Sequence, residues 1–346
     1  MQADLLKIFY DETIINNRLP VNFREKDSAI FGSAKTIKVP QSGLFLFKDV
    51  RVTDLGILYK NMQVLKENII CYDIDFKIYR FKYFLKAFLK FKKLDFKGNK
   101  AILLFDNYSG PNGFAHWICD GLTRFAEIND TLHDYTVIVP AYFKDQGIYF
   151  ETLKLFNISS IHYLEKDTLT HFKELYFPSP IGETGNFHPT NLDKLRTIVS
   201  TMLNLNTAAT KNIYISRAKA KRRFIKNEKD VLKVLSKYDF EIYYLEDHTF
   251  SEQIKIVNSA ANIISIHGAA LALLAFAKEG ASVMELRSKS DDINNMYYIL
   301  ANASKLNYYY LNCLSIFKTN TGNNFDLAVD ITELEENVKQ MVLKAK

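Results

Sequence analysis

A histidine and an aspartate lie four residues apart in the segment His116-Trp-Ile-Cys-Asp120. On a helix this spacing places both side chains on one face. An imidazole beside a carboxylate is a plausible general-base pair, in which Asp120 either takes the proton itself or orients His116. A metal would need a third ligand, and the widely spaced cysteines Cys71, Cys119 and Cys313 are not placed to supply one. An ordinary pair on a helix surface has the same spacing.

A second group of candidate residues follows two expected strands. A strand just before Ser216 and Arg217 would deliver both residues to its carboxyl end. A second buried strand ends at His267, where Gly268 turns the chain into an expected helix. Further cations follow Arg217 without an acidic neighbour, namely Lys219, Lys221, Arg222 and Arg223.

This arrangement suits phosphate. Ligands of open α/β sheets bind at the carboxyl ends of the strands. The N–H groups of a helix start favour a phosphate oxygen, and arginine offers planar, bidentate donors. If both segments belong to one sheet, they would form a diphosphate clamp. The alternatives are a plain turn with a core histidine and a solvated basic loop.

The segment Arg80–Lys93 has the pattern of a cationic amphipathic helix. Five apolar residues share one expected face, namely Phe81, Phe84, Leu85, Phe88 and Leu89. Lysines occupy the opposite face, namely Lys82, Lys86, Lys90 and Lys93. Such a helix can lie on an anionic membrane surface. Alternatively, its aromatic face packs into the first domain.

The elements that must position these residues alternate between strands and helices after residue 98. In the first part, strands are expected over 101–107, 135–141, 160–164 and 173–178, with helices over 112–129 and 146–157. A turn-rich segment, 178–189, is the expected linker. Beyond it the alternation continues to about residue 286, which predicts an α/β fold with parallel strands. We expect domains at 1–185 and 190–315, followed by a tail helix at 316–346.

Composition limits the class of protein. The 346 residues carry 45 Lys+Arg against 39 Asp+Glu, a net charge of +6, and 48% are hydrophobic. Such a chain can bury sizeable cores and is not intrinsically disordered. We expect no secretory signal, because charged residues interrupt the apolar ones over Met1–Pro20. We expect no membrane span, because polar residues interrupt the uncharged stretch Ser259–Ala277. Basic clusters at 77–100 and 211–223 favour anionic partners.

Taken in order, these motifs resemble glycosyltransferase family 61. The stretch His116-Trp-Ile-Cys-Asp120-Gly-Leu-Thr-Arg124 is similar to that family's His-Trp-x-x-Asp-x-Leu-Pro-Arg segment. Three further segments follow in the family's order, namely Tyr214-Ile-Ser-Arg217, His267-Gly-Ala-Ala-Leu271 and Ser282-Val-Met-Glu285-Leu. The resemblance covers about residues 101–290. Thr123 stands where the family has proline, and Ala270 where glycine is common.

The resemblance implies a GT-B fold, in which two Rossmann-like domains face each other across a cleft that holds a nucleotide-sugar. Domain 1–185 would then be the acceptor side and domain 190–315 the nucleotide side. Asp120, helped by His116, would be the catalytic base, with inversion at the anomeric carbon and no metal or other cofactor. Arg217 and one of Arg222 and Arg223 would hold the diphosphate, and Glu285, expected at a strand end, would receive a ribose hydroxyl. The residues assigned to the nucleotide-sugar are Asn112, Ser216, Arg217, Arg222, Arg223, His267, Gly268, Ala269 and Glu285.

The implied activity is transfer of a sugar to a hydroxyl of a growing polysaccharide or lipid-linked glycan, as in capsule or lipopolysaccharide synthesis. The expected location is cytoplasmic and peripheral at the inner face of the cytoplasmic membrane, through residues 80–93. One alternative is a polysaccharide pyruvyl transferase-like enzyme, although its N-terminal Gly-Asp-type signature is not evident. Another is a nucleic-acid-binding protein that uses the basic clusters and aromatic residues. We expect no nucleic-acid partner, because the aromatic residues follow strand and helix patterns.

Overall fold

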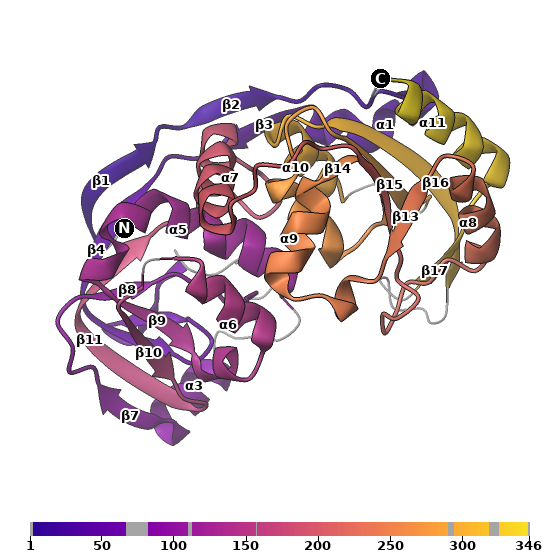
Figure 1. Cartoon of the computed structure of the whole chain (residues 1–346). Coiled ribbons are helices and arrows are strands. Elements are labelled where there is room, and N and C mark those ends of the chain that lie inside the picture. The colour runs from indigo at the N-terminus through magenta and orange to yellow at the C-terminus, as the bar shows by residue number, and fades with distance from the viewer. Residues whose placement is uncertain are drawn as a thin grey trace. The chain divides into compact units, whose positions relative to one another are not determined.

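The computed structural model describes residues 3–66, 82–109, 113–156, 158–289, 294–317 and 325–344, and the chain forms two compact units (Figure 1). Unit 1 comprises Met1–Thr13 and Lys38–Ile198, and unit 2 comprises Ile14–Ile37 and Val199–Lys346. Residues 14–37, which we expected in the first domain, are therefore part of unit 2. Both units are mixed α/β structures that contain parallel strands.

The sheet of unit 1 mixes parallel and antiparallel strands. Its order is β10-β9-β8-β11-β4-β5-β6, with β1 added to β4 and β7 added to β11. β8, β9 and β10 are parallel, whereas β11 is parallel to β8 and antiparallel to β4. The strands are β1 (Asp4–Tyr10), β4 (Ser42–Thr53), β5 (Leu58–Lys60), β6 (Gln63–Val64), β7 (Lys92–Asp95), β8 (Ala101–Leu103), β9 (Thr136–Pro140), β10 (Ser160–Leu164) and β11 (Thr168–Pro178). β8 is shorter than the expected strand, because neighbouring strands pair with it only up to Leu103.

The expected helix over 112–129 is helical from Phe114 onward but is not a uniform α-helix. It consists of α4 (Phe114–His116), a π-helical turn η4 (Trp117–Leu122) and α5 (Thr123–Ile128). The other helices of this part are α3 (Lys82–Lys90), η5 (Asn129–Asp134), η6 (Ala141–Lys144), α6 (Gly147–Lys154) and α7 (Pro189–Leu203), which passes into unit 2. β2 (Thr13–Asn16) and β3 (Thr36–Val39) form a separate two-stranded sheet.

The turn-rich segment 178–189, expected as a linker, lies within unit 1. It connects β11 to α7, and its side chains Ile181 and Phe187 are buried. The Ser179 N–H donates to the Gly43 carbonyl (2.9 Å). The segment is therefore packed structure, because apolar side chains anchor its turns.

Helix α3 is shorter than expected and packs through a narrower face. It ends at Lys90, because the following residues join the sheet as β7. Phe84 and Phe88 pack on Tyr59, with ring centroids 5.9 and 5.3 Å away. Leu85 and Leu89, which we expected on the same buried face, are exposed, and Leu89 is 76% exposed. The expected residues Arg80 and Phe81 lie outside the described part of the chain.

Unit 2 is built on a predominantly parallel sheet with the order β13-β12-β14-β15-β16-β17. Only its last strand, β17, is antiparallel to its neighbour. The strands are β12 (Lys211–Ile215), β13 (Phe240–Tyr243), β14 (Ala260–Ile266), β15 (Ser282–Ser288), β16 (Asn307–Phe317) and β17 (Phe325–Ala328). The chain passes from β12 to β13 on one side and then returns to β14 on the other. Ligands bind beyond the carboxyl ends of the strands at such a reversal.

The helices of unit 2 are η1 (Glu25–Asp27), α1 (Ser28–Phe31), η2 (Gly32–Ala34), α8 (Glu228–Ser236), η7 (Leu245–Asp247), α9 (Phe250–Asn258), η8 (Ala269–Phe276), α10 (Met296–Ala303) and α11 (Ile331–Lys344). α8 and α11 lie side by side (Figure 1), and Val231, Leu334 and Val338 bury their side chains in one core with the sheet. The expected tail 316–346 thus supplies a strand and a core helix to unit 2. η8 replaces the α-helix expected over 269–277 with a 3₁₀-helix. Among the described residues, no helix is long and apolar enough to cross a membrane.

Candidate active site

The π-helical turn η4 positions Asp120. All six residues of Trp117–Leu122 are buried. A side chain at Gly121 would place Cβ only 2.6 Å from the Trp117 ring, so the turn needs glycine there. The Trp117 indole N–H also donates to the Thr152 hydroxyl (2.7 Å). π-helical turns are rare and often occur at functional sites, and this one carries the predicted base.

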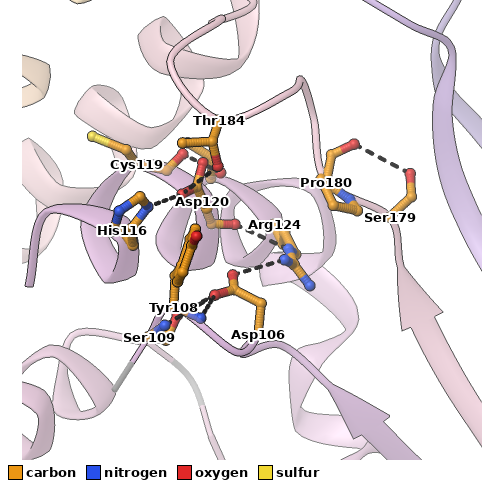
Figure 2. Close-up of polar contacts among 11 residues, drawn as sticks. Asp106, Tyr108, Ser109, His116, Cys119, Asp120, Arg124, Ser179, Pro180 and Thr184 are labelled. Atoms are coloured by element: carbon orange, nitrogen blue, oxygen red, sulfur yellow. Dashed lines mark hydrogen bonds and ion pairs between the residues drawn. The ribbon is translucent and has the colours of Figure 1, made fainter. Parts of the chain in front are cut away.

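The structure brings His116 and Asp120 together, as their spacing predicts. His116 Nδ1 lies 2.8 Å from Asp120 Oδ2, and the Thr184 hydroxyl donates to the same oxygen (3.2 Å), as Figure 2 shows. The Asp120 side chain is 6% exposed and that of His116 is 28% exposed. Burial on its own lowers the pKa of His116, but the hydrogen bond and charge of Asp120 raise it above its ordinary value. The pair can therefore hold and transfer a proton.

A buried ion pair lies behind this dyad. Arg124 Nη2 contacts Asp106 Oδ2 at 3.0 Å, and both side chains are 0% exposed. Arg124 Nε also donates to the carbonyl of Asp120 (2.9 Å), which fixes the π-helical turn (Figure 2). Asp106 Oδ1 accepts from the N–H groups of Tyr108 and Ser109. Burial raises the pKa of Asp106, and the charge of Arg124 opposes this rise.

A small pocket in unit 1 contains Asp120. Its walls come from η4, α5, α7 and the turn-rich segment, through Cys119, Asp120, Thr123, Ile181, Gly182, Asn186, Phe187, His188, Asn191 and Leu192. The segment that we expected to be a linker thus forms a wall of this pocket. Burial raises the pKa of the Cys119 thiol well above its ordinary value, which makes it a poor nucleophile.

The predicted phosphate-binding residues lie on neighbouring strands of unit 2. β12 ends just before Ser216 and Arg217, and the adjacent β14 ends just before His267 and Gly268. Arg217 packs against Gly268 so closely that a Cβ there would lie 2.8 Å from Arg217 Nη1. A larger residue at 268 would push the Arg217 guanidinium away from the turn. The structure confirms that these two segments meet in one sheet.

The loop after β12 gathers positive charge. Arg217 Nη2 donates to the carbonyl of Arg222 (3.1 Å), and Arg223 Nη1 donates to the carbonyl of His267 (3.2 Å). Arg223 adopts the left-handed backbone conformation, with φ of 63°, which is uncommon without glycine. Burial, followed by the charge of Arg223, lowers the pKa of Arg217, and Arg222 adds to this while Glu246 opposes it. Of the two candidates, Arg223 is the arginine held at the His267 turn, because it bonds to the His267 carbonyl whereas the Arg222 side chain is exposed.

Glu285 does not lie at a strand end. It sits inside β15, is 1% exposed, and has both oxygens occupied. Oε1 forms a short hydrogen bond with His267 Nδ1, and Oε2 accepts from the Tyr308 hydroxyl at 2.5 Å. The expected position was wrong because the strand continues to Ser288. Because Glu285 is buried and each oxygen already accepts a hydrogen bond within the protein, it is not placed to receive a ribose hydroxyl.

The remaining predicted residues differ in their surroundings. Ser216 is buried, and its hydroxyl donates to Glu228 Oε1 (2.7 Å). Ala269 begins η8 directly after Gly268. Asn112 lies outside the described residues. Within the described ranges, no group of three or more His, Cys, Asp and Glu side chains is arranged to hold a metal ion.

Sequence reasoning missed Asp106, Thr184 and Tyr308. Asp106 follows a buried strand, which is a detectable signal for a residue at a sheet edge. Thr184 and Tyr308 carry no such signal, because their partners are 64 and 23 residues away in sequence.

Comparison with known proteins identifies the segment that carries both sites. The sequence model of the family described as Glycosyltransferase 61 matches residues 114–284. These residues belong to glycosyltransferase family 61. The resemblance of the motifs is thereby confirmed, and the family 61 segment holds the His116–Asp120 dyad as well as the Arg217–Gly268 contact.

The curated relatives that this chain matches carry glycosyltransferase names. Protein O-linked-mannose beta-1,4-N-acetylglucosaminyltransferase 2 from Mus musculus is 28% identical over 138 residues, 37% of this chain and 24% of the relative. The Homo sapiens protein of the same name gives the same identity and coverage. The Bos taurus protein is 34% identical over 73 residues, 20% of this chain and 12% of the relative. The chain thus matches no more than about a quarter of the length of these relatives.

Proposed function

We propose that this protein is an inverting glycosyltransferase that moves a sugar from a nucleotide-sugar to a hydroxyl of a glycan acceptor. The observation that carries the proposal is the contact of Arg217 with Gly268, at the ends of adjacent parallel strands within the family 61 segment. A cation is held there against a backbone turn at the position where open sheets bind ligands.

The donor diphosphate would bind to Arg217, Arg223 and the turn 267–269. Burial and the charge of Arg223 both lower the pKa of Arg217, so an anion between the two arginines would relieve their repulsion. The Nε atom of Arg217 is buried and has no hydrogen-bond partner among the described residues, so a phosphate oxygen reaching it would satisfy this donor. Such donors would stabilise the charge that develops on the departing diphosphate.

Asp120, helped by His116, would act as the base on the acceptor side. As the acceptor oxygen attacks the anomeric carbon, its proton passes to the dyad. The bond from that carbon to the diphosphate oxygen breaks, and the diphosphate leaves with the electron pair. Thr184 and His116 hold one oxygen of Asp120, while no described residue donates to the other. Since Asp120 lines the unit 1 pocket, we propose this pocket as the point where the acceptor hydroxyl enters.

The proposal includes a GT-B arrangement and a metal-independent reaction. The strand order of unit 2 supports a Rossmann-like nucleotide domain. The arginines in the loop after β12 would take the part that a divalent cation plays at other diphosphate sites. The names of the relatives make N-acetylglucosamine the first sugar to test.

We also propose that α3 and β7 form a cationic surface that binds an anionic partner. That partner would be the inner face of the cytoplasmic membrane, where it carries a lipid-linked polysaccharide acceptor of the capsule or lipopolysaccharide type. Exposed Leu85 and Leu89 lie beside exposed Lys82 and Lys90. Lys86 is partly neutralised by Asp167 at 2.9 Å. Apolar side chains next to cations suit the interface of an anionic bilayer.

One experiment compares Asp120→Asn with Arg217→Ala. Transfer is measured with a panel of nucleotide-sugars, and binding of nucleoside diphosphates is measured by calorimetry. Asp120→Asn should reduce transfer by about 10²–10⁴-fold and leave nucleotide affinity unchanged. Arg217→Ala should weaken nucleotide affinity by about 1.5–3 kcal/mol, the value of a charge-assisted hydrogen bond.

Asp130→Asn is the matched control, because Asp130 is exposed and lies in the turn that follows α5. EDTA should not stop turnover. If no nucleoside diphosphate binds the wild-type protein, or if the folded Arg217→Ala protein binds as well as wild type, the donor site is misassigned. Transfer by Asp120→Asn within tenfold of wild type would remove Asp120 from the role of base.

A further inference from the structure

A buried hydrogen-bonded chain lies behind His267. The Tyr308 hydroxyl of β16 donates to Glu285 Oε2 (2.5 Å), and Glu285 Oε1 bonds to His267 Nδ1. Glu285 and Tyr308 are 1% and 3% exposed, so neither side chain is placed to meet a ligand in solution. This series of hydrogen bonds begins in the interior of unit 2 and ends at the turn that precedes η8.

A carboxylate accepts hydrogen bonds and cannot donate them, so the hydrogen in the Glu285–His267 bond belongs to Nδ1. Burial on its own would raise the pKa of Glu285, but the His267 imidazole, with Arg287 and Tyr308, holds it below its ordinary value. Glu285 therefore stays ionised and fixes both the ring orientation and the tautomer. Nε2, 3.3 Å from the Asn294 amide nitrogen, is left as the ring nitrogen whose protonation can change.

Two arginines and an aromatic ring also lie near His267. Arg223 contacts its carbonyl, and Arg217 lies against Gly268. The Tyr297 ring of α10 lies 5.0 Å from the imidazole. A bound phosphate would add a negative charge on this side of the imidazole, where the two arginines lie.

We infer that Glu285, backed by Tyr308, is a positioning residue that holds His267 so that Nε2 can donate to an oxygen of the donor diphosphate. The inference rests on the proposed nucleotide-sugar site. It replaces the ribose contact expected for Glu285, since this side chain is buried and bonded within the protein. Binding of the diphosphate would then take up a proton on Nε2, and Asn294 would release that nitrogen.

Two ligands separate this role from a ribose contact. Calorimetry of the full chain with a nucleoside diphosphate and with inorganic pyrophosphate compares wild type with Glu285→Gln. A positioning role predicts that Glu285→Gln weakens both ligands by about tenfold or more, because both present the phosphates to His267. A ribose contact predicts a loss for the nucleoside diphosphate alone, and that result would overturn the inference.

The pH dependence gives a readout that a merely structural role would not move. If Nε2 donates to the phosphates, the affinity of wild type for pyrophosphate should depend on pH. Glu285→Gln should change that dependence, and Tyr308→Phe should change it less. An unchanged pH profile in a folded Glu285→Gln protein would contradict the inference.

A second variant, His267→Gln, separates an effect through His267 from a general loss of structure in Glu285→Gln. It should remove the pH dependence, and adding Glu285→Gln to it should then cost no further affinity. If the second substitution costs as much as in the wild-type background, Glu285 does not act through His267. Arg217→Ala should lower affinity at every pH, because it removes a cation of the clamp. Retained affinity in that variant would refute the proposed clamp itself.

Discussion

The buried ion pair of Asp106 and Arg124 gives a stability prediction with a defined size. Both side chains are 0% exposed, and Asp106 also accepts two backbone N–H groups. Asp106→Asn keeps the shape but leaves the Arg124 charge uncompensated. Removing one partner of a buried pair costs about 3–5 kcal/mol, whereas an exposed pair contributes about 0–1 kcal/mol. We therefore expect a loss of about 3–5 kcal/mol in the free energy of unfolding of unit 1.

The chain provides its own probe and control for this measurement. Trp117 is the single tryptophan, and it is buried in η4 of unit 1, so its fluorescence reports unfolding of that unit. Urea titrations at pH 8 should show a midpoint lower by about 1 M or more for Asp106→Asn. Glu165→Gln removes the exposed pair with Lys144 (3.1 Å) in the same unit and should shift the midpoint little.

A double variant tests the cause. Replacing the pair by Asp106→Leu with Arg124→Met removes both buried charges and should recover much of the stability lost in the single variant. Equal, small shifts for Asp106→Asn and Glu165→Gln would refute the reasoning, because the buried and exposed pairs would then contribute alike. A double variant less stable than Asp106→Asn would show that hydrogen-bond geometry, and not uncompensated charge, sets the cost.

Two further predictions concern pH and surface binding. The pKa of His116 is raised above 6.5, so its pairing with Asp120 should stabilise unit 1 below about pH 6.5 and lose this effect as the pH rises through the raised value. In urea titrations followed by Trp117 fluorescence, the difference in midpoint between wild type and His116→Gln should therefore shrink from pH 6 to pH 8.5. A constant difference would contradict the assignment. Two double variants of α3 should reduce co-sedimentation at low salt with vesicles that contain phosphatidylserine, namely Lys82→Gln with Lys90→Gln and Leu85→Asn with Leu89→Asn. For the lysine pair the reason is that each cation contributes about 1 kcal/mol near such a surface. Lys229→Gln with Lys255→Gln, on α8 and α9, is the matched control, and equal sedimentation of all variants would exclude α3 as the docking surface.

The tertiary structure decided the environment of each candidate residue. Glu285 is enclosed because β16 brings Tyr308 beside it. The sequence motif around Glu285 does not predict this neighbour. Asp106 reaches Arg124 across 18 residues, and Thr184 reaches Asp120 across 64. Leu85 and Leu89 follow the same periodicity as Phe84 and Phe88, yet only the aromatic pair meets Tyr59. These outcomes depend on which strands become neighbours, and a local pattern does not encode that choice.

The sequence by itself determined the features that depend on short spacings. An interval of four residues on a helix fixes the contact of His116 with Asp120, even though the helix is π-helical there. Alternation of buried strands with helices fixes a parallel sheet, and therefore places Arg217 and His267 just beyond strand ends. Hydrophobic periodicity is a local property, so it predicts which residues follow the end of a strand and which share a helix face. Burial, partners and charge balance arise only when distant segments pack, and they decide which of these residues can reach a ligand.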